Sequence, residues 1–329
     1  MNDFLYTTNP DAKDAIEAYV RQRCDESCTV VSSSGGWGSF ASVARPSTPH
    51  VFIDNDRHLY LLIGNPSFQG RYVGSRKGAV DQGAISRLVD ESFRKEQALR
   101  WHEHFNGQFA MVAVQKHTGM VFMASDMLQF ITTYYTTHPG VAGPWFTCGS
   151  QINHVADISG RHALDPVSIA ESLLYKTTTS PHTFLDNILT VPPATVLFRQ
   201  PEGGIALKRY WEPREPETID FTIEECGREL RRIAESNLEQ VARDYDSIAI
   251  LLSGGSDSRA VAGILRGVPN IEALTFSESV NRETSLARRI AEIAGLPFRL
   301  FSHNSDYYLD HIDKCSELAG IDQFFIHSH

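Results

Sequence analysis

One turn, Ser253-Gly-Gly-Ser-Asp-Ser258, combines glycines, hydroxyls and a carboxylate in a pattern typical of ligand binding. An apolar run from Ile248 to Leu252 precedes the turn and predicts a strand buried on both faces, as in a parallel sheet covered by helices. A helical pattern begins directly after the turn, at Arg259. Backbone N–H groups at the start of a helix lack acceptors, and the helix dipole makes that end positive. The turn is therefore predicted to bind an anion.

The glycines and serines of this turn indicate which kind of anion it takes. Gly254 and Gly255 allow a phosphate to approach the backbone closely. The turn lacks the lysine of the G-x-x-x-x-G-K-[ST] phosphate loop and the G-x-G-x-x-G spacing of a dinucleotide site. It resembles the Ser-Gly-Gly-x-Asp-Ser loop of ATP pyrophosphatases, which split ATP between the α and β phosphates. The resemblance implies a phosphorylated nucleotide as ligand, and a plain glycine turn between a strand and a helix is the alternative.

Composition and charge argue against several other classes of protein. The 329 residues suffice for two domains, and 42% hydrophobic with 21% charged residues is ordinary for a soluble globular chain. The net charge of −10 argues against a nucleic-acid partner. We find neither a run of about 20 apolar residues, as a membrane span needs, nor a secretory signal. Five scattered cysteines predict reduced thiols, so we expect a cytoplasmic protein without a membrane partner.

The first two hundred or so residues read mostly as short strands bounded by turn residues. The predicted strands are Thr29–Ser32, Val51–Ile53, Leu59–Ile63, Phe109–Gln115, Val121–Ser125, Ile131–Tyr135 and Thr195–Phe198. Helices are predicted at about Asp81–Phe105 and Asp165–Leu174, the second opened by an aspartate cap and Pro166. Strands in series with few helices predict an α+β domain with largely antiparallel sheets.

A proline-rich acidic connector at 210–220 separates this half from one with a different pattern. We therefore expect one domain at 1–209 and a second at 221–329. The second begins with a capping box, Thr222-Ile-Glu-Glu225, in front of a helix. Strands at Ile248–Leu252, Ile271–Phe276 and Phe298–Phe301 then alternate with helices at Arg259–Leu265, Glu283–Ala294 and Ser305–Leu318. This βαβαβ order predicts an open parallel sheet whose ligand lies at the carboxyl ends of its strands.

Several stretches together resemble the glutamine-dependent asparagine synthetases. Those similar to the synthetase domain are Leu251–Ser258, Ala273-Leu-Thr-Phe-Ser277 and Ser285–Gly295, and Phe105-Asn-Gly-Gln-Phe-Ala-Met-Val-Ala113 is similar to the amidotransferase domain. Later landmarks are Tyr134-Tyr135, Leu189-Thr-Val-Pro-Pro193 and Tyr210-Trp211. The resemblance implies an Ntn-hydrolase-like α+β domain with antiparallel sheets. A PP-loop (adenine nucleotide α-hydrolase-like) α/β domain with a parallel sheet would follow it.

The resemblance also implies a reaction, of the kind used in asparagine biosynthesis. A substrate carboxylate attacks the α-phosphorus of ATP, pyrophosphate leaves, and ammonia or an amine captures the acyl-adenylate to give an amide. The residues that would cradle pyrophosphate are Ser253, Gly254, Gly255, Ser256, Asp257 and Ser258. Asp257 would also help hold Mg²⁺, and Leu252 and Phe276 would lie near the adenosine. Arg259 would either assist the phosphates or form a surface salt bridge.

Position 2 departs from the pattern of these synthetases. Their glutaminase domain uses an N-terminal cysteine as nucleophile, whereas this chain has Asn2, and an amide cannot supply a thiolate. We therefore expect no glutaminase activity from the first domain. Ile63-Gly-Asn-Pro66, which resembles the glutamine or oxyanion loop of the family, is then expected to be only a turn. Ammonia or a substrate amine would supply the nitrogen, as in the β-lactam synthetases and lasso-peptide cyclases, which also lack the cysteine.

The end of the sequence leaves a second function open. The synthetase domain of the family continues with a second glycine-acid loop and a catalytic lysine, and neither motif occurs before His329. We expect a fragment, a truncated gene product, or a chain completed by a partner polypeptide. The alternative to an amide-forming enzyme is therefore a catalytically incomplete nucleotide-binding or assembly subunit. No residue identifies the acyl substrate.

Two further stretches invite a functional interpretation that their surroundings do not favour. The glycine-rich segment Ser32–Ser39 is predicted to be a surface hairpin rather than a second phosphate loop, because no helical pattern follows it. Asp54-x-Asp56 is predicted to be a turn between two strands rather than a pair of metal ligands.

Overall fold

The computed structural model describes residues 2–46, 48–73, 81–95, 100–141, 143–215 and 220–319. The chain divides into two compact units: unit 1 holds the described residues up to Pro213, and unit 2 holds Arg214–Leu318. The division falls inside the range 210–220, where the connector is expected. In the described part of the chain, no helix is long and apolar enough to cross a lipid bilayer.

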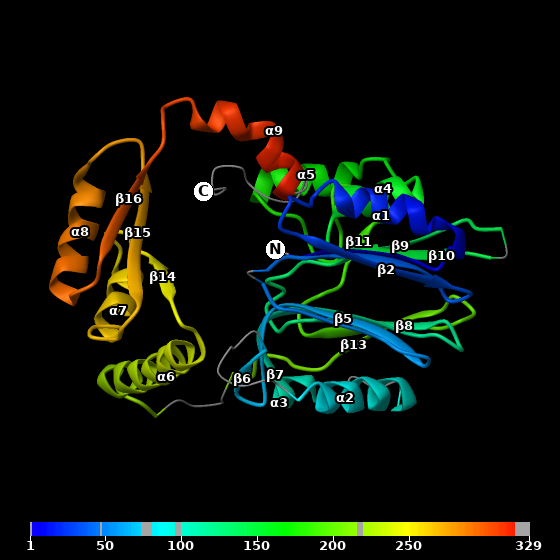
Figure 1. The fold of residues 1–329 in the computed structure, drawn as a ribbon, viewed down its shortest axis with the longest axis horizontal. Helices are drawn as coiled ribbons and strands as arrows, with labels where there is room; N and C mark the ends of the chain where they lie inside the picture. Colours follow the sequence, from blue (N-terminus) through cyan, green and yellow to red (C-terminus); the bar gives the residue numbers. More distant parts are fainter. Residues whose placement is uncertain are drawn as a thin grey trace. The chain divides into compact units, whose positions relative to one another are not determined.

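Unit 1 is built on two antiparallel sheets (Figure 1). Sheet A has the order β11-β9-β10-β1-β3-β2, formed by β1 (Asp3–Thr7), β2 (Thr29–Gly35), β3 (Gly38–Ala44), β9 (Tyr134–His138), β10 (Trp145–Gly149) and β11 (Leu189–Thr190). Sheet B has the order β13-β12-β8-β7-β5-β4, formed by β4 (His50–Asp54), β5 (His58–Phe68), β7 (Phe105–Gln115), β8 (Met120–Ser125), β12 (Thr195–Arg199) and β13 (Ile205–Arg209). The short β6 (Arg71–Tyr72) pairs with β5.

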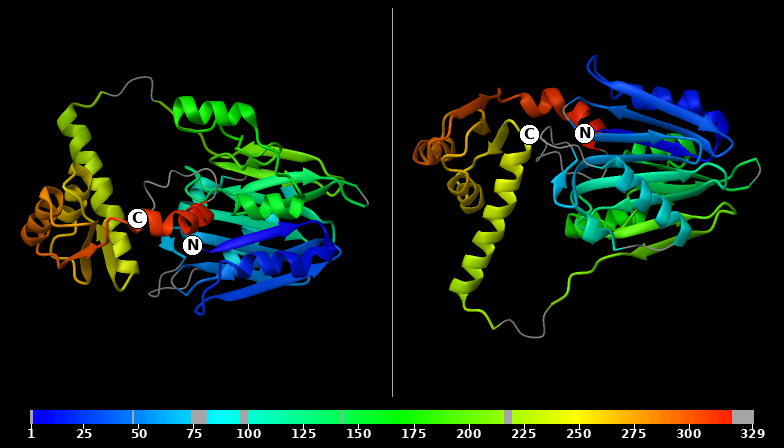
Figure 2. Two further views of the ribbon diagram at one scale, coloured as in Figure 1. Left: turned by 90° about the horizontal axis from the view of Figure 1, so that it is seen from above. Right: turned by 60° about the horizontal axis from the view of Figure 1, so that its bottom comes forward.

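Helices cover the outer face of each sheet, which gives a four-layer arrangement of helix, sheet, sheet and helix (Figures 1 and 2). On sheet A lie α1 (Lys13–Arg21), which follows the short 3-10 helix Pro10–Ala12, and α4 (Ile152–Ser159). Helix α5 (Pro166–Tyr175), in which Ser168 is the buried residue, lies beside the sheet. On sheet B lie α2 (Gln82–Lys95) and α3 (Trp101–His104). Ile16 and Val155 pack into the outer face of sheet A, and Phe93 and Trp101 into that of sheet B. A third cluster, which includes Phe4, Leu61 and Val112, fills the space between the sheets.

The antiparallel sheets of unit 1 confirm the expected α+β class. The hairpin expected at Ser32–Ser39 is formed by β2 and β3, and the turn at Asp54–Asp56 joins β4 to β5. The helix expected over Asp81–Phe105 was wrong at its end, because Phe105 begins β7. The strand expected from Ile131 begins only at Tyr134, because the buried carboxylate of Asp126 accepts from the N–H groups of Leu128, Phe130 and Ile131 and holds them in a loop.

The turn expected at Ile63–Pro66 was also wrong, because these residues lie inside β5. Their pairing with β7 continues without interruption from Ile63 opposite Ala110 to Pro66 opposite Gly107. Gly64 makes this possible: its φ is +103°, and a Cβ there would lie 2.3 Å from the carbonyl oxygen of Gln108. Only glycine allows the two backbones to approach so closely.

Unit 2 alternates helices and strands around a small parallel sheet. Its elements are α6 (Ile223–Asp244), β14 (Ile248–Leu251), α7 (Ser256–Ile264), β15 (Ile271–Ser277), α8 (Arg282–Ala294), β16 (Phe298–Ser302) and α9 (Tyr307–Ala319). The three strands pair in parallel in the order β14-β15-β16, which confirms the predicted βαβαβ sheet. The capping box predicted at Thr222–Glu225 is present at the start of α6.

The prediction that β14 is buried on both faces was wrong. Helices α7 and α8 pack on one face of the sheet through a cluster that includes Ala262, Ala273 and Ala291. The other face carries Leu251 and Phe276, which are 70% and 45% exposed. Exposure therefore alternates along β14, because the described helices of unit 2 cover only one side of the sheet.

Candidate functional site

The predicted anion-binding turn leaves the parallel sheet at the carboxyl end of β14. Leu252 anchors its start, because its N–H donates to the carbonyl of Leu274 at 2.8 Å and its carbonyl accepts from Thr275 Oγ1 at 2.6 Å. The Leu252 side chain is 2% exposed and belongs to the core cluster of unit 2. Only its backbone is therefore available to a ligand. The chain turns outward at the next residue, Ser253.

Two serine side chains hold the turn in shape. Ser253 Oγ and Ser258 Oγ lie 2.9 Å apart, and the N–H of Ser253 donates to Ser258 Oγ at 3.2 Å. The N–H of Gly255 donates to Ser253 Oγ, also at 3.2 Å. These hydroxyls, predicted to cradle pyrophosphate, thus bind the loop itself and fix the positions of its other amides.

Three other amides of the turn have no acceptor within the described part of the chain: those of Gly254, Ser256 and Asp257. Helix α7 begins here with Gly255 as N-cap and without a side-chain cap. Helices α6 and α8 differ, because each begins with a capping box in which the N-cap side chain accepts from the amide of the third helical residue. Since Gly255, Ser256 and Asp257 are exposed, the positive end of α7 is open to solvent and can take a negatively charged group.

The first turns of α8 form a wall beside this loop. A Cβ on Gly254 would lie 3.0 Å from Leu286 Cδ2 and 3.8 Å from Glu283 Cγ, so both side chains stand over the glycine. Phe276, at the carboxyl end of β15, is half-exposed and stacks on Phe301 of β16 with ring centroids 5.2 Å apart. The sequence analysis singled out Phe276 but missed Glu283, Leu286 and Phe301. The predicted βαβαβ order could have pointed to these residues, because it places the start of α8 and the ends of the strands at the same edge as the loop.

Asp257 and Arg259 bring the charges of this site. The exposed carboxylate of Asp257 accepts from Ser256 Oγ at 3.2 Å. No group of three or more His, Cys, Asp or Glu in the described residues could hold a metal ion alone, so a cation would share Asp257 with oxygen atoms of a ligand. Arg259 Nη2 donates to the carbonyl of Gly254 at 3.4 Å. This guanidinium lies beside the loop rather than in one of the ion pairs found on the described surface.

At the start of unit 1, Asn2 is a buried structural residue. Its Nδ2 donates to the carbonyl of Pro49 at 2.8 Å, and its Oδ1 accepts from the N–H of Arg45 at 2.9 Å and from Thr48 Oγ1 at 2.7 Å. The next residue, Asp3, forms a buried ion pair with Arg23 at 2.8 Å. The amide nitrogen and the amide oxygen of the Asn2 side chain are thus both hydrogen-bonded. Neither atom can act as a nucleophile.

The cysteines of unit 1 offer no evident replacement for the missing nucleophile. Burial raises the pKa of the Cys24 thiol, and the neighbouring Cys28 raises it further. Cys148 is completely buried, which raises its pKa well above the usual value. A raised pKa keeps a thiol protonated at neutral pH, and the thiolate is the reactive form. All five cysteines are free.

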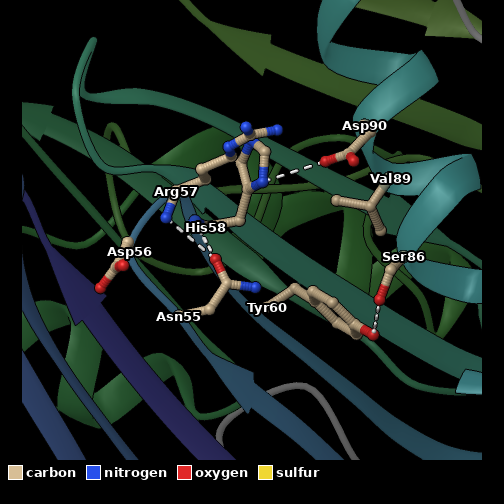
Figure 3. A pocket seen from close by; sticks show the side chains of 8 residues that line it. All are labelled: Asn55, Asp56, Arg57, His58, Tyr60, Ser86, Val89 and Asp90. Atoms are coloured by element: carbon tan, nitrogen blue, oxygen red, sulfur yellow. Dashed lines mark hydrogen bonds and ion pairs between the residues drawn. The ribbon is translucent and has the colours of Figure 1, made fainter. Parts of the chain in front are cut away.

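A polar cavity of about 340 Å³ in unit 1 was missed by the sequence analysis (Figure 3). His58 of β5 lies in its wall, with Nδ1 3.0 Å from Asp90 Oδ1 of α2, and Tyr60 Oη lies 2.8 Å from Ser86 Oγ. The His58 ring stacks on Phe93, and burial lowers its pKa, so the ring is neutral at pH 7. Its Nε2 is buried and does not face the solvent. Through its contact with Asp90, this histidine links β5 to α2.

The comparisons with known proteins find similarity among solved structures alone. No protein-family model matches the chain, and no curated protein matches it. Among solved structures, the chain is similar to the NH3-dependent NAD synthetase from Campylobacter jejuni in complex with the nitrate ion, with 17% sequence identity and a TM-score of 0.23. The similarity covers 31% of this chain and 44% of that synthetase, so the chain spans less than half the length of this relative. So slight a similarity carries no argument about function, which rests on the residues of the chain itself.

Proposed function

We propose that unit 2 binds ATP and uses it to activate a carboxylate, with release of pyrophosphate and then of AMP as an amide forms. The observation that carries the proposal is the open, uncapped start of α7 at the carboxyl end of a parallel sheet. The sequence Ser253-Gly-Gly-Ser-Asp-Ser258 at this point adds the resemblance to loops that bind the β and γ phosphates of ATP. In open parallel sheets this edge is where ligands bind.

Each part of the loop has a role in this proposal. The amides of Gly254, Ser256 and Asp257 would stabilise the charge that grows on the departing pyrophosphate. Asp257 would hold Mg²⁺, which supplies further positive charge at the phosphates when bound. Phe276 and Phe301 offer an exposed aromatic surface for the adenine. The backbone of Leu252, rather than its buried side chain, would face the nucleoside.

The chemistry of the proposal is an exchange of bonds at the α-phosphorus. A carboxylate oxygen forms a bond to that phosphorus as the bond to the β-phosphate oxygen breaks. An amine nitrogen then attacks the acyl carbon, loses a proton, and displaces AMP. The nitrogen is proposed to come from ammonia or from an amine of the substrate, as in an asparagine synthetase-like enzyme without glutaminase, because Asn2 cannot act as a thiol nucleophile.

A second function is favoured by one observation, the exposed apolar face of the unit 2 sheet. Leu251 is 70% exposed and Phe301 38% exposed on this face, where a doubly wound sheet would carry further helices. The second candidate is therefore a nucleotide-binding subunit that needs a partner polypeptide for catalysis. It binds ATP and does not turn it over alone.

The test incubates the full chain with ATP, Mg²⁺, ammonia and a panel of amino-acid and other carboxylates. We expect pyrophosphate and AMP in equal amounts, and removal of Mg²⁺ by EDTA should abolish their release. Asp257→Asn should lower the rate by about 100-fold or more, since metal and electrostatic contacts supply several kcal/mol to such steps. Asp310→Asn is the matched control, because it removes another exposed carboxylate from the first turn of a helix.

The products distinguish the two functions. ADP and phosphate, instead of AMP and pyrophosphate, would contradict the proposed reaction. Saturable ATP binding by calorimetry without any pyrophosphate would favour the nucleotide-binding subunit. If ATP does not bind at all, or if Asp257→Asn and Asp310→Asn bind and react alike, the loop is not the site.

A further inference from the structure

A cavity of about 300 Å³ opens at one end of unit 1, apart from the loop of unit 2. Loops from both sheets line it: the β2–β3 turn, the β7–β8 turn, the segment before β10, and the end of β12. These tips lie at the end of the sandwich opposite the N-terminus (Figure 1). The cavity is at the lower end of the range for small-molecule sites.

Two tryptophans form the walls of this cavity. The Trp37 ring is stacked parallel to the buried ring of Tyr6, with centroids 6.3 Å apart, and Tyr6 Oη donates to the Trp37 carbonyl at 2.7 Å. The indole of Trp37 folds back over Gly35, where a Cβ would lie 2.7 Å from its Nε1. Trp145 lies against Gly140 in the same way, also at 2.7 Å. Backed by glycines, the two indoles hold fixed positions.

Arg199 brings a positive charge to the wall of the cavity. It is only 8% exposed, and Nη1 donates to the carbonyl of Gly119 at 3.3 Å. No carboxylate of the described residues pairs with it; Glu202, on the same hairpin, is exposed and acts on it at longer range. Burial accordingly lowers the pKa of the Arg199 guanidinium, because the charge loses water without gaining a counter-ion. A buried, unpaired charge is costly, and a bound anion would remove that cost.

Further donors stand beside the guanidinium, since the indoles of Trp37 and Trp145 each carry one N–H group. Lys116 adds positive charge near Trp37, with Nζ 5.7 Å from the ring, although it also pairs with Asp54. Two flat aromatic walls favour a flat ring between them, and the donors favour a carboxylate on that ring.

We propose that this cavity binds a small aromatic carboxylate, with the carboxylate on Arg199 and the ring between Trp37 and Trp145. The ligand would supply the counter-ion that the Arg199 guanidinium lacks among the described residues. This site is separate from the ATP site proposed for unit 2, and its occupancy does not depend on that proposal.

The test uses benzoate as probe and the indole N–H signals of the ¹⁵N-labelled full chain as readout. The sequence has four tryptophans, Trp37, Trp101, Trp145 and Trp211, so four indole signals are expected. Benzoate should shift those of Trp37 and Trp145 and leave the signal of the buried Trp101 in place. Acetate, which has the charge without the ring, and benzyl alcohol, which has the ring without the charge, should each bind at least about tenfold more weakly.

Variants separate a binding role of Arg199 from a structural one. Arg199→Met keeps an apolar stem and removes the charge, so we expect the affinity for benzoate to fall by about tenfold or more while the melting temperature stays unchanged or rises. Arg209→Met is the matched control: it removes an exposed guanidinium of the same hairpin that pairs with Glu212, and it should bind benzoate normally. Trp145→Leu, at a half-buried position, should also weaken binding.

Three outcomes would overturn the proposal. The first is the absence of any benzoate-dependent shift at Trp37 and Trp145. The second is equal affinity in wild type and Arg199→Met. The third is equal binding of benzoate, acetate and benzyl alcohol, which would exclude an aromatic carboxylate as the class of ligand.

Discussion

At the scale of single residues, Asn2 supports stability. Its side chain accepts from Arg45 and Thr48 and donates to Pro49, and it is completely buried. Asn2→Ala leaves these partners unsatisfied, and we expect a loss of about 2–3 kcal/mol. In calorimetry the melting temperature of unit 1 should fall by roughly 5–10 °C.

Asn237→Ala is the control for this change, because Asn237 is exposed in the middle of α6. It should leave stability unchanged or raise it slightly, since alanine is the better helix former. A melting temperature of Asn2→Ala equal to that of wild type would show that water replaces these hydrogen bonds without cost.

Residue types in the sequence indicated one of the two proposed sites and not the other. The turn at Ser253–Ser258 was singled out as a candidate because six consecutive residues carry its pattern. No sequence pattern pointed to Arg199. It differs from other arginines because no carboxylate of the described residues pairs with it and because two indoles from distant hairpins line the same cavity. Such surroundings depend on long-range packing, which a local pattern does not contain.

At the scale of elements, the starts of α6, α7 and α8 in unit 2 differ in one respect that bears on the proposed function. α6 and α8 are closed by capping boxes, whereas α7 is not. Gly255→Asp would place a carboxylate at this N-cap, where φ is −71° and compatible with any residue. We expect stability to fall by about 1 kcal/mol, because a Cβ at Gly255 would lie only 3.2 Å from Ser253 Oγ. ATP binding should fall by about tenfold or more, because the carboxylate occupies the amides and repels the phosphates.

Gly227→Asp is the matched control for Gly255→Asp. It adds the same charge in α6, at a position where a Cβ meets no other atom. Both variants should be compared by calorimetric titration with ATP. Unchanged ATP binding in Gly255→Asp would rule out the start of α7 as the phosphate site.

The sequence analysis missed several elements of unit 1, among them β1 and β10, which are short, and β3, which is built mostly from small residues. β3 reads Gly-Ser-Phe-Ala-Ser-Val-Ala and was not predicted, although Ser39 and Ser42 are completely buried in it. It lies between β1 and β2 and under α1, where small side chains fit. α1 was missed because only Ile16 and Val20 face the core, which is too narrow a stripe to recognise.

At the scale of the whole molecule, we expect the two units to respond differently to acid. Burial lowers the pKa of three histidines, His50, His58 and His138, and all three belong to unit 1. A histidine whose pKa is lowered on folding is neutral in the folded state, while the unfolded chain takes up its proton from about pH 6.5 downward. Unit 1 is therefore fully stable above that pH and loses stability as the pH falls. In unit 2 the described histidines, His303 and His311, are not buried.

Tryptophan fluorescence tests this difference, because Trp37, Trp101, Trp145 and Trp211 all lie in unit 1. Between about pH 7.5 and 5.5 we expect the urea midpoint followed by fluorescence to fall. Part of the far-UV circular dichroism change does not follow fluorescence, and this part reports the helices of unit 2. Its urea midpoint should stay the same over this pH range. Carboxylates whose pKa is lowered on folding, such as Asp81 and Asp165, do not interfere, since their contribution to stability is lost only near about pH 4 and below.

His58→Gln removes one of the three buried histidines and should make the fluorescence midpoint less sensitive to pH. A fluorescence midpoint independent of pH over this range would mean that the buried histidines are charged in the folded protein.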